Sequence, residues 1–193
     1  MHALIVVAHP DPQSLTHQVA GELARSLGAD HSFEIADLAA EGFDPRYNPE
    51  DQALFRERAV VPADVLAEQA RIDRADALVL VYPVYWWSFP ALLKGWVDRV
   101  FSGGWAYDEQ ERGLLQRLPV HLVALGGAGP RTYDKHGYSV AMHTQIEHGI
   151  FAYCGARVAS SALLTQADEA FPQGHFEAAR RIGRELFSHR SRT

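Results

Sequence analysis

Five short apolar runs, each long enough for one β-strand, alternate along this chain with segments whose apolar residues recur at helical spacing. The runs are "ALIVVAH" at residues 3–9, "SFEIADL", "ALVLVYP" at 77–83, "PVHLVALGG" at 119–127 and "ARVASSALL". Most of them are apolar at nearly consecutive positions, which is typical of strands covered on both faces. The alternation therefore predicts an α/β fold, with a parallel sheet between two layers of helices.

The segments between the runs indicate helices. After Ser14, the residues Val19, Leu23 and Leu27 recur at four-residue spacing, as on one face of a helix. Further helices are expected in "PADVLAEQARIDRA", "FPALLKGWVDRVF", residues 139–153 and "HFEAARRIGRELF". At 193 residues, the chain is expected to form a single domain, 1–193.

Two long segments, residues 38–62 and 102–118, do not fit this alternation. The first is rich in charged residues and proline, and the second reads "SGGWAYDEQERGLLQRL". Long excursions in compact domains are often binding loops or subunit contacts. We expect one of these roles for each.

Charge and composition exclude several classes of function. With 18 basic and 24 acidic residues, the formal charge is −6, and the short tail "RSRT" holds the only basic cluster, which argues against nucleic-acid or anionic-membrane binding. No apolar stretch approaches the roughly 18 to 20 residues that span a bilayer, and the start lacks the features of a signal peptide. Cys154 is the single cysteine, which suits a reducing cytoplasm, and its apolar setting indicates core packing rather than a catalytic thiol.

The ten histidines do not indicate a metal site. None of them falls in an HExxH or a mixed Cys/His pattern. His143 and His148 are five residues apart, which does not place both on one face of an α-helix. We therefore expect no metal ligands in this chain.

The segments that follow the first, third and fourth strands should meet, because ligands of open parallel sheets bind beyond the carboxyl ends of the strands. After the first strand comes "HPDPQSLTHQ", where a helix start offers unpaired N–H groups and Ser14 and Thr16 offer hydroxyls. Such a turn can hold a phosphate. The alternatives are that Ser14 only caps the helix and that His9 only ends a strand.

The next two segments add rings and glycines. In "PVYWWSFP", three consecutive aromatic residues cannot all point into one core, so some should line a crevice or a subunit interface, although packing under the following helix is the alternative. In "GGAGPRTYDKHG", the glycines allow a ligand close to the backbone, and Tyr133 and His136 supply groups suited to proton transfer. A phosphate seat, an aromatic wall and a glycine floor together favour a flavin nucleotide.

On these residues the chain resembles the NAD(P)H:quinone oxidoreductases, the DT-diaphorase-like branch of the flavodoxin-like proteins. The resemblance implies a three-layer sandwich with five parallel strands in the order 2-1-3-4-5, a tightly bound flavin and a homodimer. It runs from about residue 3 to 165 and is carried by "ALIVVAHPDPQSLT", "AEQARIDRADALVLVYPVYWWSFPALLKGWVDRVFSGGWAY", "ALGGAG", "HG" and "YCGARV".

The resemblance also implies roles for individual residues. The flavin's ribityl-phosphate region would contact His9, Ser14, Leu15 and Thr16, and its ring system would contact Pro83, Val84, Trp86, Trp87, Gly126 and Gly127. Trp86, Tyr107 and Tyr153 match aromatic positions of the substrate pocket, with Tyr107 reaching across the dimer. His136 and Tyr133 fall near the family's histidine and tyrosine that interact with the reduced flavin, and the compressed spacing between them leaves the role of Tyr133 open.

The implied activity is a two-electron, ping-pong reaction. NADH or NADPH would pass a hydride to the flavin and leave, and a quinone or a similar flat acceptor would then take both electrons in the same pocket. FAD is the expected cofactor, because Asp98 matches the acidic residue on the "KGW" helix with which related proteins bind the adenylate half. FMN is the alternative, because segment 38–62 is short and Glu177 falls near the expected position of an adenylate-binding arginine.

Two other functions stay open. One is a regulatory ancillary subunit of a potassium-efflux transporter, because such subunits have a quinone-reductase-like domain. The other is a one-electron carrier of the flavodoxin type, although those proteins tend to be more acidic.

Overall fold

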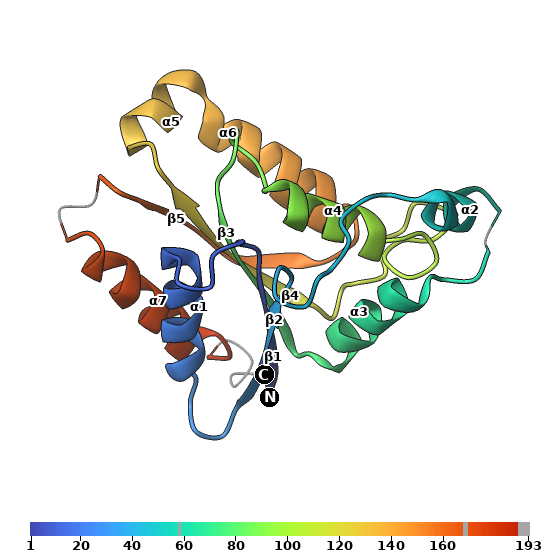
Figure 1. Cartoon of the computed structure of the whole chain (residues 1–193), viewed down its shortest axis with the longest axis horizontal. Helices are drawn as coiled ribbons and strands as arrows, with labels where there is room; N and C mark the ends of the chain where they lie inside the picture. Colours follow the sequence, from blue (N-terminus) through green and yellow to red (C-terminus); the bar gives the residue numbers. More distant parts are fainter. Residues whose placement is uncertain (58, 168–169, 189–193) are drawn as a thin grey trace.

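A five-stranded parallel sheet forms the centre of the computed structural model, which describes residues 1–57, 59–167 and 170–188. The strand order is β2-β1-β3-β4-β5, so the predicted order is confirmed. Each strand pairs in parallel with its neighbours, and the carboxyl ends meet at one edge (Figure 1). The strands are β1 His2–Val7, β2 Ser32–Asp37, β3 Ala77–Pro83, β4 Pro119–Gly126 and β5 Arg157–Thr165.

Two helices, α1 Leu15–Arg25 and α7 Gln173–Glu185, cover one face of the sheet (Figure 1). They pack against apolar side chains of β1, β3 and β4, among them Ile5 and Val79. At Gly183 the two helices lie so close that an added Cβ would stand 2.3 Å from the carbonyl oxygen of Leu23. The contact fixes α7 against the helix that follows β1.

The other face is covered by α3 Ala63–Arg74, α4 Ala91–Val100 and the helix η1 His143–Ala152. Trp96 of α4 is fully buried there, and its indole N–H donates to Glu68 at 2.8 Å. Because successive strand residues point to opposite faces, Leu4 and Val6 join this cluster while Ile5 joins the other.

The predicted helix over 139–153 is divided in the structure. It begins as α6 Tyr138–Met142 and continues as η1, a π-helix of 10 residues. In a π-helix, residues five apart are joined by backbone hydrogen bonds, so the spacing argument against a shared face for His143 and His148 does not apply. Within the described residues, no three His, Cys, Asp or Glu side chains are placed to hold a metal ion.

A short helix, α5 Pro130–His136, follows the glycines after the fourth strand and was not predicted. Pro130 stands in its first turn, where a missing N–H costs nothing, and Gly137 ends it with a φ of 68°. The signals for a helix start and stop were therefore present in the sequence. They hold Tyr133 and His136 on one rigid element.

The segment 38–62 also contains an unpredicted helix, α2 Pro49–Glu57. The buried guanidinium of Arg99 ties this segment to α4, because it contacts Asp51 at 2.8 Å and the carbonyl oxygen of Asp44 at 2.8 Å. It also contacts Asp64 of α3 at 2.6 Å. The excursion is thus folded onto the domain. By contrast, 102–118 consists of turns and isolated bridges without a helix.

Cys154 is 4% exposed, and burial raises the pKa of its thiol to about 11, in agreement with the predicted core position. Among the residues that the structure describes, none of the helices has both the length and the apolar character that a membrane crossing requires.

Candidate active site

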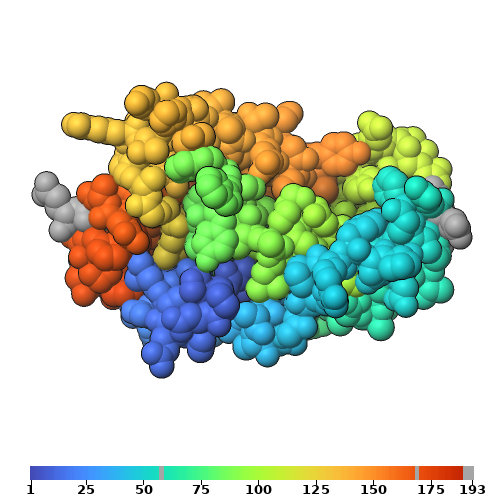
Figure 2. Space-filling model, turned by 45° about the horizontal axis from the view of Figure 1, so that its top comes forward, coloured from blue at the N-terminus to red at the C-terminus, as the bar shows by residue number. Residues whose placement is uncertain are grey.

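A hollow of about 280 Å³ lies at the carboxyl edge of the sheet. Figure 2 looks toward this edge and shows the segments after β1 (blue), β3 (green) and β4 (yellow) lying side by side. Eight of the ten predicted cofactor-binding residues line it, and Trp86 and Trp87 do not. The lining residues are His9, Ser14, Leu15, Thr16, Pro83, Val84, Tyr85, Leu125, Gly126, Gly127, Leu164, Gln166 and His175.

The sequence reasoning missed the contributions of β5 and α7 to this hollow. Leu164 is near the end of β5, Gln166 follows that strand, and His175 is in the first turn of α7. The rule that ligands bind beyond the carboxyl ends applies equally to the fifth strand. That rule could have identified Leu164 and Gln166.

The segment after β1 is held by its own side chains. The backbone N–H of Asp11 donates to His9 Nδ1 at 3.0 Å, and the Asp11 carboxylate accepts from the N–H of Gln13 at 2.8 Å. Ser14 caps α1, because its hydroxyl oxygen accepts from the N–H of His17 at 3.3 Å. Ser14 therefore caps the helix and also lines the hollow, so its role as a cap does not remove it from the predicted site.

The aromatic run after β3 forms a tight turn. Tyr85 and Ser88 exchange backbone hydrogen bonds of 3.2 and 3.1 Å, and the central Trp86 and Trp87 have φ angles of 48° and 59°. Bulky residues rarely adopt positive φ, and such strain clusters at binding sites. None of the three consecutive rings lies in the core, because Tyr85 and Trp86 are 48% and 93% exposed and Trp87 is half-buried.

Trp87, Tyr133, His136 and Tyr138 form an aromatic cluster next to the turn. The ring of Trp87 stacks on Tyr138 at 3.7 Å and meets Tyr133 edge-on at 5.2 Å. The exposed ring of His136 also stacks on Tyr138, with the ring centroids 5.2 Å apart. Tyr138 was not predicted, and it links the two candidate catalytic residues to the aromatic turn.

Tyr133 is 1% exposed, and its hydroxyl stands 2.5 Å from the position of a Cβ added to Gly126. The phenol therefore occupies the space that glycine leaves free at the floor of the hollow. Burial raises the pKa of Tyr133 above its ordinary value near 10, so the hydroxyl keeps its proton at neutral pH.

The three residues predicted for the substrate pocket divide in the structure. Tyr107 and Tyr153 lie together, with ring centroids 5.4 Å apart. Tyr107 lines a separate hollow of about 510 Å³ between α2 and segment 102–118, together with Phe55 and Arg112. Trp86 lines neither of the two hollows.

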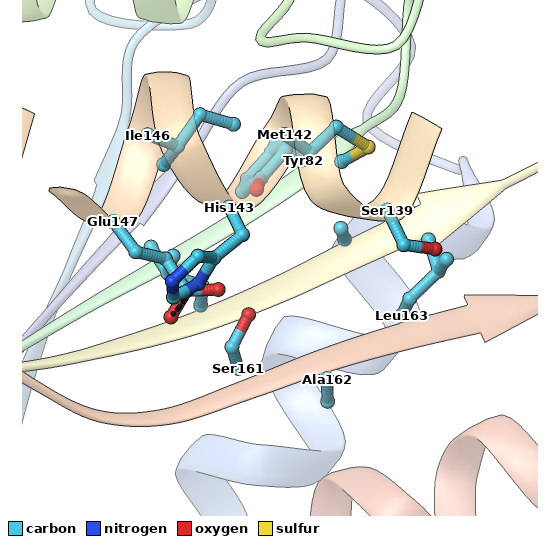
Figure 3. Close-up of a pocket in the computed structure, with 11 residues that line it drawn as sticks. Tyr82, Ser139, Met142, His143, Ile146, Glu147, Ser161, Ala162 and Leu163 are labelled. Atoms are coloured by element: carbon cyan, nitrogen blue, oxygen red, sulfur yellow. Dashed lines mark ion pairs between the residues drawn. The ribbon is translucent and has the colours of Figure 1, made fainter. Parts of the chain in front are cut away.

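A third cavity, of about 210 Å³, lies under η1 and above β4 and β5 (Figure 3). His143 and Glu147 stand at one side of it, with Nδ1 and Oε2 3.3 Å apart. Tyr82 lines its inner part and stays protonated, because burial, followed by the charge of Glu147, strongly raises its pKa. None of the predicted site residues lines this cavity.

The strand order 2-1-3-4-5 and the hollow at the carboxyl ends of the strands are typical of flavodoxin-like proteins. The chain belongs to the family described as having a flavodoxin-like fold, which it matches over residues 1–186. Among individual proteins, it is 32% identical to the human ribosyldihydronicotinamide dehydrogenase [quinone] over 183 residues, covering 80% of this chain and 77% of that protein. The structure of the NAD(P)H:quinone oxidoreductase from Methanothermobacter marburgensis is also similar, with a TM-score of 0.86, 28% identity and 96% of both chains covered. The general stress protein 14 from Treponema denticola, solved in complex with FMN, matches with a TM-score of 0.64, 25% identity and 95% of both chains covered.

Proposed function

We propose that the protein is a flavin-dependent NAD(P)H:quinone oxidoreductase that reduces quinones or similar flat acceptors by two electrons. The observation that carries the proposal is the hollow at the carboxyl edge, where three separate segments bring together a helix start, an aromatic turn and a glycine floor. The two similar dehydrogenases named above act on quinones according to their names, and those names support the same activity here. Neither refers to a transporter, so they give no support to the regulatory alternative.

The residues present fit a flavin. The start of α1 offers N–H groups and the hydroxyl of Ser14 to a phosphate. A Cβ added to Gly127 would meet no atom within 4 Å, so the protein's own packing leaves this part of the floor open. We propose that His9, Ser14, Leu15 and Thr16 hold the ribityl-phosphate region, with Pro83, Val84, Trp86, Trp87, Gly126 and Gly127 along the ring system.

A bound flavin would supply the chemistry of accepting and donating a hydride. The chain's own residues would place donor and acceptor and exclude water, and the aromatic turn provides flat surfaces for both. Tyr133 keeps its phenolic proton and can donate a hydrogen bond from Oη toward the floor of the hollow. We propose that Tyr133 and His136 stabilise the negative charge that reduction creates, as preorganised donors do in other active sites.

FAD is the proposed cofactor, with FMN as the alternative. Asp98 of α4 is the acidic residue that the resemblance associates with the adenylate half, and here its carboxylate contacts Lys94 at 2.5 Å. The similar structure that contains FMN favours the alternative. Chromatography of the released cofactor distinguishes the two.

We further propose that two copies of the chain complete each site. Tyr107 and Tyr153 lie together but do not line the hollow that would hold the flavin. Trp86 and Phe55 are 93% and 68% exposed, and a partner subunit would cover them. Tyr107 would then reach the active site of the partner subunit. Sedimentation equilibrium of the purified protein should give twice the mass of one chain.

The first experiment is an absorption spectrum of the purified protein, before and after anaerobic addition of NADH or NADPH. We expect a yellow cofactor near one equivalent per chain, bleaching by one of the nucleotides and recovery of colour when a quinone is added. A one-electron carrier would show a new long-wavelength band during reduction. If saturating FAD or FMN neither binds nor is reduced, the proposed function is wrong.

A further inference from the structure

Two side chains at the start of α1 and one from the end of β2 form a hydrogen-bonded chain. Ser14 Oγ lies 2.9 Å from His17 Nδ1, and His17 Nε2 lies 2.8 Å from Asp37 Oδ2. Ser14 lines the hollow at the strand ends, and Asp37 is the last residue of β2. The His17 and Asp37 side chains are only 15% and 22% exposed. The series of hydrogen bonds thus runs from the partly buried carboxylate of Asp37 to Ser14 at the hollow.

The partners of Asp37 fix the direction of these hydrogen bonds. One carboxylate oxygen, Oδ1, accepts from the N–H groups of Ala39 and Ala40 at 3.2 Å, and the other faces His17. An ionised carboxylate only accepts, so His17 Nε2 carries a hydrogen. In the neutral ring, Nδ1 is then an acceptor, and the Ser14 hydroxyl must donate to it. Ser14 therefore turns a lone pair, and not its hydrogen, toward the hollow.

Protonation of His17 reverses the bond between His17 and Ser14. Nδ1 of the imidazolium donates to Ser14 Oγ, which frees the serine hydrogen to point into the hollow. The hollow gains a hydrogen-bond donor and a nearby positive charge, and both favour a phosphate oxygen.

We propose that His17 and Asp37 are positioning residues for Ser14, and that binding of the cofactor's phosphate is coupled to uptake of one proton from solvent by His17. The inference rests on the proposed function, because it takes the bound group to be a flavin phosphate. It assigns roles to two residues that would not touch the cofactor's ring.

Few other charges face His17. Asp37 comes from β2, and the ring of His9, in the segment after β1, stands 6.3 Å away edge-on. On its own helix, Glu22 and Arg25 share a surface hollow with His17, and Phe176 is the contribution of α7 to that hollow. Both carboxylate oxygens of Glu22 are engaged by arginines, namely Arg25 and Arg180, each at 2.7 Å. Among the described residues, Asp37 is thus the anion in contact with His17.

The test is flavin binding, measured by fluorescence between about pH 5 and pH 8, where histidine ordinarily changes its charge. FAD is the ligand for the pH series, because the phosphate monoester of FMN itself titrates near pH 6. Riboflavin, which lacks a phosphate, is the reference ligand. We expect the dissociation constant of FAD to fall by up to tenfold per unit of decreasing pH, while that of riboflavin stays constant.

Two variants should behave in opposite ways. His17→Gln cannot take up this proton, so FAD should bind about tenfold more weakly at pH 6 and should lose the part of the pH dependence that His17 causes. In Asp37→Asn, the side-chain oxygen keeps the N–H groups of Ala39 and Ala40, so the amide NH₂ donates to Nε2. The hydrogen of the ring then moves to Nδ1, and this variant should bind FAD at pH 8 at least as tightly as the parent.

The chain provides a matched control at the opposite edge of the sheet. His2 Nδ1 lies 2.9 Å from Ser32 Oγ, and His2 Nε2 lies 4.0 Å from Glu34 Oε2, so His2→Gln removes a similar contact away from the site. It should leave FAD binding unchanged. The inference is overturned if His17→Gln keeps the parent's affinity and pH dependence, or if it weakens riboflavin as much as FAD. A parent protein that binds no flavin would overturn the proposed function, and this inference with it.

Discussion

Two clusters of charged and polar side chains join distant segments of this molecule, and they differ in how deeply their ion pairs are buried. Around Arg99, which is 3% exposed, two carboxylates and a backbone carbonyl satisfy the guanidinium and tie the 38–62 excursion to α4. Around His17, a single carboxylate holds a ring whose other nitrogen reaches a serine at the edge of a hollow. Beside the first cluster, Asp51 and Arg99 line a hollow of only about 50 Å³, whereas Ser14 of the second cluster lines the hollow of about 280 Å³.

The difference shows how similar residue types serve architecture or binding. Removing one partner of a buried ion pair leaves the other charge uncompensated, so changes at Arg99 are expected to affect the stability of the fold. The partly exposed side chains of Ser14, His17 and Asp37 can exchange a proton and change their hydrogen bonds while the protein stays folded. Variants in the two regions should therefore separate stability from binding.

The largest expected effect is that of Arg99→Leu. The change leaves Asp51, which is 3% exposed, without its cationic partner, and the free energy of unfolding should fall by about 3 to 5 kcal/mol. Urea denaturation measures the loss. The control is Arg112→Leu, because Arg112 pairs with Asp108 at 2.7 Å but its side chain is 73% exposed, so less than about 1 kcal/mol is expected. Equal losses in the two variants would contradict a structural role for the buried cluster.

Substitution of glycine by alanine should change the free energy of unfolding near the Arg99 cluster but not at the hollow. A Cβ at Gly95 would stand 2.1 Å from the carbonyl oxygen of Pro45, and this overpacking should lower the free energy of unfolding by about 1 to 3 kcal/mol. Gly127→Ala meets no atom within 4 Å, so its stability should change by less than about 0.5 kcal/mol. Its affinity for FAD should fall, because the methyl group enters the proposed cofactor seat. A stable Gly95→Ala would show that the excursion can move away from α4.

Much of the architecture could be predicted from the sequence, because the strands are continuous apolar runs and the helices repeat at regular spacing. The bounds of β3 agree with the prediction residue for residue. The helices α2 and α5 were missed because each is short and lies in a segment rich in proline or glycine. The change from α6 to the π-helix has no signal in apolar spacing.

The site was predictable to the extent that topology determines it. The rule for parallel sheets brought the segments after β1, β3 and β4 together before any contact was known. The pairing of His17 with Asp37 was not predictable, because it depends on the pairing of β2 with β1 and on the position of a ring nitrogen. The contact of Tyr138 with Trp87 likewise depends on two left-handed residues that the sequence does not indicate.

The variant Tyr133→Phe tests the role of the buried Tyr133 hydroxyl in the proposed active site. The phenol is buried, and its hydroxyl lies at the Gly126 floor, so its loss should slow bleaching of the flavin by NAD(P)H about tenfold, with little change in FAD affinity. The raised pKa of Tyr133 keeps the parent's phenol protonated, so the ratio of the two rates should be constant through neutral pH. Stopped-flow absorbance measures both rates. Tyr138→Phe keeps the ring stacked on Trp87 and is the control, and an equal loss there would contradict a specific role for Tyr133.

The smallest expected effect is the pH dependence of the Arg99 cluster. Burial alone would raise the pKa of Asp64, but the hydrogen bond and charge of Arg99, together with backbone N–H groups, lower it below its ordinary value of 3.8. A carboxylate with a lowered pKa contributes stability above that ordinary value, and the contribution is lost as the pH falls through the folded value. Because the Asp64 side chain is 49% exposed, Asp64→Asn should cost less than about 1 kcal/mol at pH 7. Urea midpoints of the parent and the variant should converge as the pH falls below about 4. A difference that persists at lower pH would mean that the contact of Asp64 with Arg99 does not depend on its charge.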